Sequence, residues 1–586
     1  MSTYYSAEQN VQILIALLKA HGVRKIVASP GSANVCFVAS IHHDSFFEMY
    51  SAVDERSAAY IACGLAAETG EAVALSCTQA TASRNYFPAL TEAYYRKLPI
   101  LAITSTRATE EVGHALQQVI DRSVQPKDTV RLSVYLPVIH TEKKRWACEI
   151  NANKAILELW HRGGGPVHIN LETEYTNDFT VKELPAVKKI ERFTTNDTLP
   201  VLAPGRVGIF VASHMEWSKE LTEIVDAFCE KYDAVVHCDQ TSNYRGKYGI
   251  MHRLIGSQQQ YDAPCKKHSV LIHIGDMSGS AVNVKADEVW RISEDGELRD
   301  SFEKLRYVFE MDETSFFKKY LDVKVDTELS TSFYDEWRTE YDSLYKIAAE
   351  KKDEMPFSNP WIAMNTLSKL PEKSVVHYGI YNTLRSWSFF EPPKSVFGYA
   401  NVGGFGIDGN ISSLIGASLA NKDKLFFGIV GDLSFFYDMN SLGNRHVGNN
   451  LRIMVINNGR GTEFTIKDSF TYRAGIEPGA VSYISAEGHY GKQSRQLVRH
   501  YAEDLGFKYM TASGKEEYLD CLEQFVNPKI EDKPILLEVF TDSIDERNAL
   551  DMIYNLKKSV QRQLKQAAKG ILGEKGMQVA KKILKK

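Results

Sequence analysis

Short apolar runs alternate with amphipathic stretches along most of this chain. The first runs lie at 24–28, 48–53, 72–77 and 98–105, and residues 56–68 between two of them have helical spacing. Further runs follow at 206–212, 234–238, 269–274 and 288–292, and then at 374–379, 426–430, 452–456 and 535–540. Runs of this length are typical of buried strands, and strands separated by helices form parallel sheets. We therefore predict an α/β protein with three doubly wound parallel-sheet domains.

Turn formers and changes of pattern divide the chain into domains. The stretch 194–200 is rich in turn-forming residues and is typical of a linker. We assign residues 1–185 to a first domain, 186–345 to a central α/β domain, 346–547 to a third domain and 548–586 to a basic C-terminal helical tail.

The tail has an amphipathic helical pattern. Leu556, Val560, Leu564, Ala568 and Ile571 fall on one helical face, and Lys and Arg occupy the others. Such a segment packs on its own domain or lies on an anionic membrane surface. Both interpretations stay open from the sequence.

Composition and charge narrow the class of protein. The formal net charge of the 586 residues is −5 at pH 7, so no overall charge favours nucleic acid. The eight cysteines form no C-x-x-C pair, which favours reduced buried thiols. The N-terminus lacks a signal-peptide pattern, and no apolar run is long enough to span a bilayer. We expect a cytoplasmic protein, with the tail as the segment that would bring it to the inner membrane.

Two polar residues follow neighbouring predicted strands in the stretch 426–464. Asp432 comes after the strand at 426–430 and Asn458 after the strand at 452–456, 26 positions later. Parallel strands joined by a crossover end at the same sheet edge. Carboxylate and amide oxygens suit Mg²⁺, and the N-terminus of the intervening helix suits a diphosphate. The alternative is that both residues serve only as turn residues and helix caps.

Glu55 occupies a similar place in the first domain. It follows the strand at 48–53 and precedes the helix at 56–68, so it lies at the carboxyl edge of the first sheet. The alternative is an acid that complements the helix dipole in the first turn.

Several motifs resemble those of thiamin-diphosphate enzymes. GDLS at 431–434 with INNG at 456–459 is similar to the diphosphate motif of these enzymes. Residues 53–95, with SPGS at 29–32, TSTR at 104–107 and QQVID at 117–121, closely resemble one branch of them. That branch is the MenD family, the 2-succinyl-5-enolpyruvyl-6-hydroxy-3-cyclohexene-1-carboxylate synthases, and the similarity covers most of residues 1–545.

The resemblance implies thiamin diphosphate and Mg²⁺ as cofactors, and it implies four catalytic residues. Glu55 would hydrogen-bond the aminopyrimidine ring and promote its imino form. Arg107 would hold a substrate carboxylate, Gln118 would orient the keto oxygen, and Ser32 would lie beside the reacting carbons. Without the resemblance, these last three would be a surface arginine, a loop glutamine and a turn serine.

The resemblance also implies a cofactor-binding set. Ile407 would lie under the cofactor between its two rings, and Ser434 would lie near the diphosphate or the aminopyrimidine. The metal ligands would be Asp432, Asn458 and the backbone carbonyl of Arg460. The full set of cofactor-binding residues is Asn85, Thr383, Gly406, Ile407, Gly431, Leu433, Ser434, Asp432, Asn458 and Arg460.

In this superfamily the pyrimidine-binding domain of one subunit faces the diphosphate-binding domain of another. The resemblance therefore implies a homodimer or homotetramer with its active sites at subunit interfaces, residues 1–185 being the pyrimidine-binding domain and 346–547 the diphosphate-binding domain. The central domain carries no G-x-G-x-x-G after a strand.

The sequence departs from the family where acidic substrates are bound. Ala33 and Val402 stand where the family has arginines, and a third family arginine falls on Trp387, with Arg385 close by. Glu463 stands where an apolar residue is usual. The family segment TSGTA is TQATA at 78–82.

These departures predict an altered substrate. Each lost charge-assisted hydrogen bond weakens binding by about 1.5–3 kcal/mol. We predict decarboxylation of a small, pyruvate-like 2-oxo acid and carboligation of its acyl group to an unidentified acceptor. The alternatives are a 2-oxo acid decarboxylase that releases an aldehyde, the menaquinone-pathway synthase itself, and a non-catalytic scaffold.

Overall fold

The computed structural model describes residues 4–214, 217–279, 283–324, 332–467, 469–475, 481–489 and 493–559. The chain forms two compact units, one of Met1–Thr198 with Glu294–Glu310 and one of Leu199–Ser293 with Met311–Lys586. Within the described residues the three sheets have six, seven and six strands, and neighbouring strands pair in parallel. This confirms the predicted α/β architecture with three parallel sheets. The compact units do not test the predicted domain boundaries, which stay predictions.

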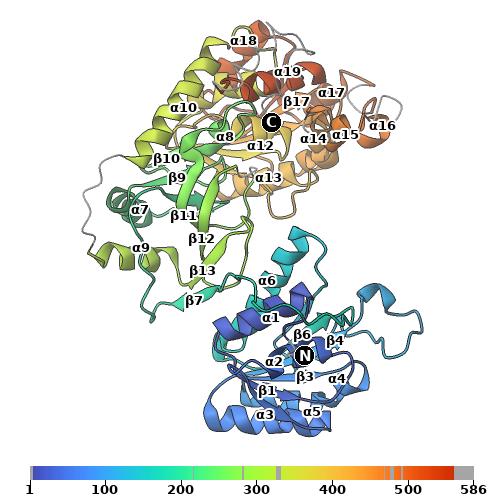
Figure 1. Ribbon diagram of the computed structural model, residues 1–586. Coiled ribbons are helices and arrows are strands. Elements are labelled where there is room, and N and C mark those ends of the chain that lie inside the picture. The colour runs from blue at the N-terminus through green and yellow to red at the C-terminus, as the bar shows by residue number, and fades with distance from the viewer. Residues whose placement is uncertain are drawn as a thin grey trace, which may run out of the picture. The chain divides into compact units, whose positions relative to one another are not determined.

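The first unit contains a sheet with the strand order β2-β1-β3-β4-β6-β5 (Figure 1). Its strands are β1 (Lys25–Ala28), β2 (Glu48–Ser51), β3 (Val73–Cys77), β4 (Ile100–Thr106), β5 (Leu132–Leu136) and β6 (Val167–Glu172). Its helices are α1 (Gln9–Ala20), α2 (Val35–His42), α3 (Glu55–Thr69), α4 (Thr81–Asn85), α5 (Phe87–Arg96) and α6 (Glu142–Glu158). The unit also holds β7 (Glu191–Thr194) and β13 (Leu305–Glu310), which pair in parallel.

Helices cover both faces of this first sheet. Ile26 and Ala74 pack into one core with residues of α1, α2 and α6. Val27 and Leu75, their neighbours along the strands, pack into another core with residues of α3 and α5. Side chains alternate between the faces of a strand, so each strand serves both cores. The doubly wound arrangement follows from this alternation.

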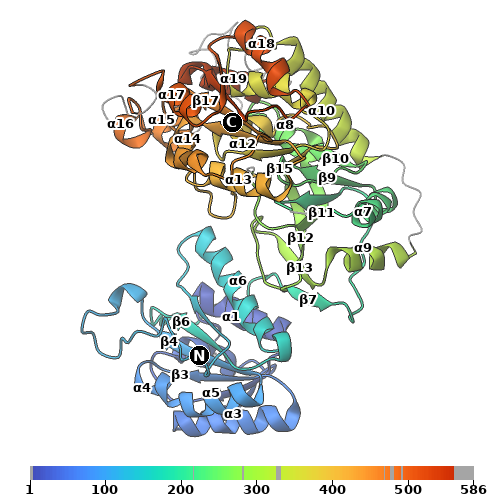
Figure 2. The same ribbon diagram turned by 180° about the vertical axis from the view of Figure 1, so that it is seen from behind.

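The second unit contains the third sheet and five strands of the seven-stranded middle sheet (Figures 1 and 2). The middle sheet runs β10-β9-β8-β11-β12 here, with β8 (Val207–Val211), β9 (Ala234–Cys238), β10 (Gly249–Met251), β11 (Lys267–Ile274) and β12 (Lys285–Ile292). Its helices are α7 (Lys219–Tyr232), α8 (His252–Gly256), α9 (Glu313–Asp322) and α10 (Phe333–Glu350).

The third sheet has the order β15-β14-β16-β17-β19-β18. Its strands are β14 (Val375–Tyr378), β15 (Phe397–Tyr399), β16 (Phe426–Gly431), β17 (Leu451–Asn457), β18 (Lys508–Ala512) and β19 (Ile535–Phe540). Its helices are α11 (Asn359–Thr366), α12 (Asn382–Trp387), α13 (Asn410–Ala420), α14 (Asp432–Asp438), α15 (Phe470–Arg473), α16 (Val481–Ile484), α17 (Leu497–Asp504), α18 (Lys515–Phe525) and α19 (Ser543–Tyr554).

Both faces of the third sheet are also covered. Ile453 packs with residues of α13, α14 and α17, whereas its neighbour Met454 lies against Tyr518 of α18 on the other face. Within the described residues, no helix has the length and apolar character needed to cross a bilayer. The predicted tail helix lies outside the described residues from position 560 onward.

The C-terminal helix α19 is tied to the third sheet through one buried carboxylate. Both oxygens of Glu546 accept the amide of Asn359 at the N-terminus of α11, each at 3.1 Å. The Thr541 hydroxyl and the Asn382 side chain of α12 donate to the same carboxylate at 2.8 and 3.1 Å. Burial raises the pKa of Glu546 from its usual 4.5 to about 7, although these hydrogen bonds oppose the shift.

Two short helices, one beside the first sheet and one beside the third, are each preceded by a non-glycine residue with positive φ. Ala80 has φ 49° and ψ −121° at the start of α4, and Tyr381 has φ 63° and ψ −120° at the start of α12. This backbone conformation favours glycine and costs other residues about 1–3 kcal/mol. Ala80 belongs to TQATA, and the resembling TSGTA segment has glycine at that position. The alanine is therefore held in a strained turn.

We predict that Ala80→Gly stabilises the first unit by about 1 kcal/mol, because relief of strain exceeds the added entropy of the unfolded chain. A higher midpoint of thermal unfolding would show this. The control Ala67→Gly lies at an exposed position in the last turn of α3, where glycine should destabilise by about 0.5–1 kcal/mol. A lower midpoint for Ala80→Gly would contradict the prediction.

We predict a pH-dependent stability contribution from Glu546. Its pKa is higher in the folded than in the unfolded chain, so the contribution is fully present below pH 4.5 and is lost as the pH rises through about 7. Glu546→Gln cannot titrate, so the stability difference between wild type and variant should fall by about 3 kcal/mol between pH 4 and pH 8. Denaturant unfolding across this range measures it. Glu523→Gln, at an exposed position of α18, is the matched control. A stability difference for Glu546→Gln that stays constant across this pH range would contradict the prediction.

Candidate cofactor site

The candidate site lies at the carboxyl edge of the third sheet. Strands β14, β16 and β17 are neighbours and run in parallel, so the residues that follow them meet at one edge. α12 follows β14, α14 follows β16, and the segment Asn458–Arg460 follows β17. Asp432 is the first residue of α14 and is buried, with 5% of its surface exposed.

Asp432 contacts the segment that follows the neighbouring strand. The amide of Gly459 donates to Oδ2 of Asp432 at 3.0 Å, and the amide of Arg460 donates to Oδ1 of Asn458 at 3.2 Å. The Arg460 guanidinium points to Glu487, at 3.2 Å. The structure therefore brings together the three residues predicted as metal ligands.

The electrostatics of the corner formed by Asp432, Asn458 and Arg460 fit a bound cation. Burial raises the pKa of Asp432 from its usual 3.8 to about 7, although the amides of Leu433 and Gly459 oppose the shift. No cationic side chain of the described residues forms an ion pair with this carboxylate. A divalent cation would supply the missing charge, and carboxylate, amide and carbonyl oxygens are the ligands that Mg²⁺ accepts.

The glycine-rich segment before α13 is joined to the same corner. Ser434 donates to the carbonyl of Ile407 at 2.8 Å and accepts the side-chain amide of Asn410 at 2.6 Å. Asn410 is the first residue of α13. The structure thus brings Ile407 and Gly406 beside α14, whose first turn carries Leu433 and Ser434 after Gly431. Thr383 is buried on α12 at the same edge.

In the first unit, Glu55 is the first residue of α3. Asp54 caps this helix by accepting the amides of Arg56 and Ser57 at 3.2 and 3.3 Å. The side-chain amide of Asn85, at the end of α4, donates to Oε2 of Glu55 at 3.3 Å. The two predicted residues Glu55 and Asn85 are therefore in contact, which no pattern in the sequence indicates.

The other three predicted catalytic residues lie in loops of the first unit. Ser32 and Gln118 are exposed, and Gln118 has φ 64°. Arg107 forms an ion pair with Glu111 at 3.4 Å, and its guanidinium lies 5.7 Å from the centre of the Tyr175 ring. None of the contacts between described residues joins Ser32, Arg107 and Gln118 to one another.

Two further residues support these loops. Gly31 of SPGS approaches Thr78 so closely that a Cβ atom there would lie 2.4 Å from the Thr78 Cβ, so only glycine fits. The side chain of Gln79 donates to the Tyr175 hydroxyl at 2.5 Å, beside Arg107. Gln79 belongs to the altered segment TQATA and was not predicted as a site residue.

The positions that lack the family arginines are filled by core residues. Ala33 and Val402 are 1% and 5% exposed. Trp387 is fully buried and donates from Nε1 to the side chain of Asn359 at 3.1 Å. Arg385 pairs with Glu463 through two contacts of 2.5 and 2.6 Å. The unusual glutamate therefore neutralises the arginine nearest to a lost family position.

A cavity of about 350 Å³ lies beside this ion pair. Its polar lining includes Arg385, Glu463, Arg253, Gln258, Asn283 and Tyr554. Arg253 was not predicted as a site residue, because it stands in the apolar stretch MHRLIG with no flanking motif.

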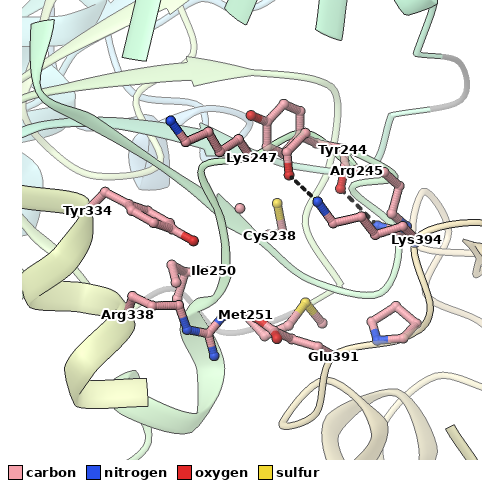
Figure 3. Close-up of a pocket in the computed structure, with 13 residues that line it drawn as sticks. Cys238, Tyr244, Arg245, Lys247, Ile250, Met251, Tyr334, Arg338, Glu391 and Lys394 are labelled. Atoms are coloured by element: carbon pink, nitrogen blue, oxygen red, sulfur yellow. Dashed lines mark hydrogen bonds and ion pairs between the residues drawn. The ribbon is translucent and has the colours of Figure 1, made fainter. Parts of the chain in front are cut away.

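Figure 3 shows a smaller cavity of about 150 Å³ beside β10. Its cations are held by groups of the protein: Arg338 pairs with Glu391 and Asp342 at 2.7 and 2.5 Å. Arg245 donates to the carbonyls of Val396 and Tyr244 at 2.9–3.1 Å. We regard this cavity as part of the packing between the middle sheet and residues 391–396.

Comparisons with known proteins point to one family. The family model "Thiamine pyrophosphate enzyme, N-terminal TPP binding domain" matches residues 9–124. A 2-succinyl-5-enolpyruvyl-6-hydroxy-3-cyclohexene-1-carboxylate synthase of Phocaeicola vulgatus is 31% identical, over 94% of this chain and 99% of the relative. The synthase of Bacteroides thetaiotaomicron is 30% identical, over 94% and 100%.

Among solved structures, a thiamine diphosphate-dependent 4-hydroxybenzoylformate decarboxylase of Rhodococcus jostii RHA1 matches with 15% identity and a TM-score of 0.37, covering 91% of this chain and 99% of that one. The full-length similarity to the synthases is much stronger, and it agrees with the motifs and with the corner at Asp432. The chain therefore belongs to the family of thiamin-diphosphate-dependent enzymes that contains the 2-succinyl-5-enolpyruvyl-6-hydroxy-3-cyclohexene-1-carboxylate synthases.

Proposed function

We propose that this protein uses thiamin diphosphate and Mg²⁺ to decarboxylate a 2-oxo acid and to transfer its acyl group to an acceptor. The observation that carries the proposal is the buried Asp432 carboxylate, which has no cationic partner among the described residues and adjoins Asn458. An ionised carboxylate in a protein interior is unfavourable unless a cation compensates its charge. A decarboxylase that releases an aldehyde would need the same corner but no acceptor.

Each predicted residue has a role that its surroundings support. Asp432, Asn458 and the Arg460 carbonyl would hold Mg²⁺, and the N-terminus of α14 would face the diphosphate. Ser434 holds the carbonyl of Ile407 and so fixes the segment expected under the cofactor. Glu55, held by Asn85, would accept and return a proton at the aminopyrimidine. When bound, the cofactor supplies the carbanion chemistry.

A subunit interface completes the proposed site. We propose that Glu55 of one copy and Asp432 of another act on the same cofactor, which requires at least a homodimer. The smallest active assembly would then hold two equivalent sites.

The relatives favour one donor and one acceptor. They are named as synthases of a 2-succinyl-substituted cyclohexene carboxylate. We therefore propose 2-oxoglutarate as the donor, because its decarboxylation leaves a succinyl unit, and isochorismate as the cyclic acceptor. Similarity over almost the whole chain favours 2-oxoglutarate as the donor over a small, pyruvate-like 2-oxo acid.

One observation favours the small 2-oxo acid as a second candidate. Ala33 and Val402 are buried apolar residues, and Arg385 is held by Glu463. These positions therefore offer an acidic substrate fewer free guanidinium groups than the family pattern does.

We predict that Asp432→Asn weakens binding of thiamin diphosphate with Mg²⁺ about 10- to 100-fold, because one charged ligand is lost. Titration calorimetry measures this on the full-length protein. Asp423→Asn, an exposed substitution just before β16, is the matched control and should bind as wild type does. Equal affinity of wild type and Asp432→Asn would contradict the assigned metal site.

We predict that Glu55→Gln keeps cofactor binding within a few-fold but lowers CO₂ release about 100-fold or more, the usual contribution of proton transfer. Glu68→Gln, at the other end of α3, should leave CO₂ release unchanged. Loss of cofactor binding together with activity would assign Glu55 a structural role instead.

We predict cofactor-dependent CO₂ release from 2-oxoglutarate, and formation of a carboligation product when isochorismate is added. Pyruvate serves as the comparison donor, with product identified by mass spectrometry. Turnover of pyruvate without turnover of 2-oxoglutarate would instead establish the second candidate. Binding of the cofactor with release of CO₂ from neither acid would overturn both.

A further inference from the structure

The cavity beside Arg385 is built by segments distant in the sequence. Arg253 comes from α8 and Asn283 from the segment before β12, both in the middle-sheet region. Arg385 comes from α12, Glu463 from the short helix Thr462–Thr465, and Tyr554 from the end of α19. The Gln258 side chain is held against the backbone of α19, because its amide donates to the Ile553 carbonyl at 2.8 Å. This contact fixes one wall of the cavity.

The cavity lies on the same sheet edge as the candidate cofactor site. Arg385 follows β14 and Glu463 follows β17, and these two strands flank β16, which ends at Asp432. In open parallel sheets, ligands bind outside the carboxyl ends of the strands. The cavity therefore stands where a substrate of the same site would lie.

Arg253 is buried without a carboxylate. It is 7% exposed, and its Nε has no hydrogen-bond partner among the described residues. Its guanidinium lies 5.6 Å from the centre of the Phe389 ring, and the Tyr554 hydroxyl interacts with it. No carboxylate of the described residues forms an ion pair with it. A buried guanidinium in this state gains free energy when an anion enters.

Glu463 sets the charge of the cavity. It pairs with Arg385 through an ion-pair contact of 2.5 Å and a hydrogen bond of 2.6 Å, so the charge of that arginine is already compensated. The other lining residues, Ser257, Gln258, Gln259, Asn283, Ile466, Ser469 and Tyr554, are uncharged. Two guanidinium groups and one carboxylate leave a surplus of one positive charge. The cavity thus matches an anion of charge −1.

We propose that this cavity binds one carboxylate group of a substrate through Arg253, with Glu463 restricting it to a single carboxylate. The inference rests on the proposed function, because it treats the cavity as part of the substrate site. The carboxylate belongs either to the donor, as the distal group of a 2-oxo dicarboxylic acid, or to a cyclic acceptor. Both sources present the same planar pair of oxygens, which an arginine binds through two parallel N–H groups.

The first test measures binding on the full-length protein with thiamin diphosphate and Mg²⁺. Glutarate serves as a non-reacting probe for the donor, and benzoate as a probe for a cyclic acceptor. Arg253→Gln should weaken binding of the matching probe about 10- to 100-fold, and Arg253→Lys should weaken it less. Arg338→Gln, in the cavity of Figure 3, is the matched control and should bind as wild type does.

A second variant keeps the test valid if Arg253→Gln does not fold. Ser469 lines the cavity and caps α15 by accepting the amide of Tyr472 at 3.2 Å. Aspartate caps helices as well as serine does, so Ser469→Asp should fold and add one negative charge. It should weaken probe binding about tenfold, and less so in high salt.

Kinetics then separate the two sources of the carboxylate. If the donor supplies it, Arg253→Gln raises KM for 2-oxoglutarate in CO₂ release without acceptor. If the acceptor supplies it, CO₂ release is unchanged and KM for isochorismate rises. Either result supports the proposal.

Three results would overturn it: binding of neither probe to the wild-type protein, wild-type affinity in a folded Arg253→Gln, or wild-type affinity in Ser469→Asp. Failure of the proposed function looks different. It would appear as absence of CO₂ release from any 2-oxo acid, with Arg253-dependent binding of glutarate or benzoate retained.

Discussion

The hydrogen bond from the Gly459 amide to the buried Asp432 carboxylate joins the ends of two neighbouring parallel strands, β16 and β17. This hydrogen bond holds together a site in which the Asp432 carboxylate is buried away from water. No cationic side chain of the described residues forms an ion pair with this carboxylate. Burial alone would favour protonation, and a divalent cation reverses that preference. The Ser434 and Ile407 contact adds the glycine-rich segment before α13 to the same corner. Asn458, Ser434 and Ile407 are thereby brought near the one buried carboxylate of Asp432.

Burial and charge pairing distinguish the positions that depart from the family pattern. Two family arginine positions carry Ala33 and Val402, both buried. Arg385 remains, but Glu463 occupies its guanidinium. Loss of Glu463 would leave the largely buried Arg385 guanidinium without its counter-charge, which is costly in a protein interior. Arg253, at the same sheet edge, is a buried guanidinium that forms no ion pair with a carboxylate of the described residues.

Local patterns in the sequence predicted much of the fold. β9 and β19 begin and end at the predicted residues, and α3 differs by one residue at each end. The meeting of Asp432 with the Asn458 segment followed from parallel topology alone. The 18-residue helix α10 was not predicted, nor were short edge strands such as β10 and β15. Contacts such as Arg385 with Glu463 and Asn85 with Glu55 join residues distant in sequence, and neither periodicity nor turn chemistry encodes them.

The strained residues Ala80 and Tyr381 lie in similar loops, one next to the first sheet and one next to the third. Each has φ near +50° to +60° and ψ near −120°, and each precedes a short helix that carries a proposed site residue. Asn85 ends the first helix, and Thr383 with Arg385 lies on the second. A strained turn persists only where surrounding contacts hold it. Glu546 supplies such a contact to α12 through Asn382. Helix α19 therefore supports the helix that carries both the proposed cofactor contact Thr383 and the Arg385 of the Arg385–Glu463 pair.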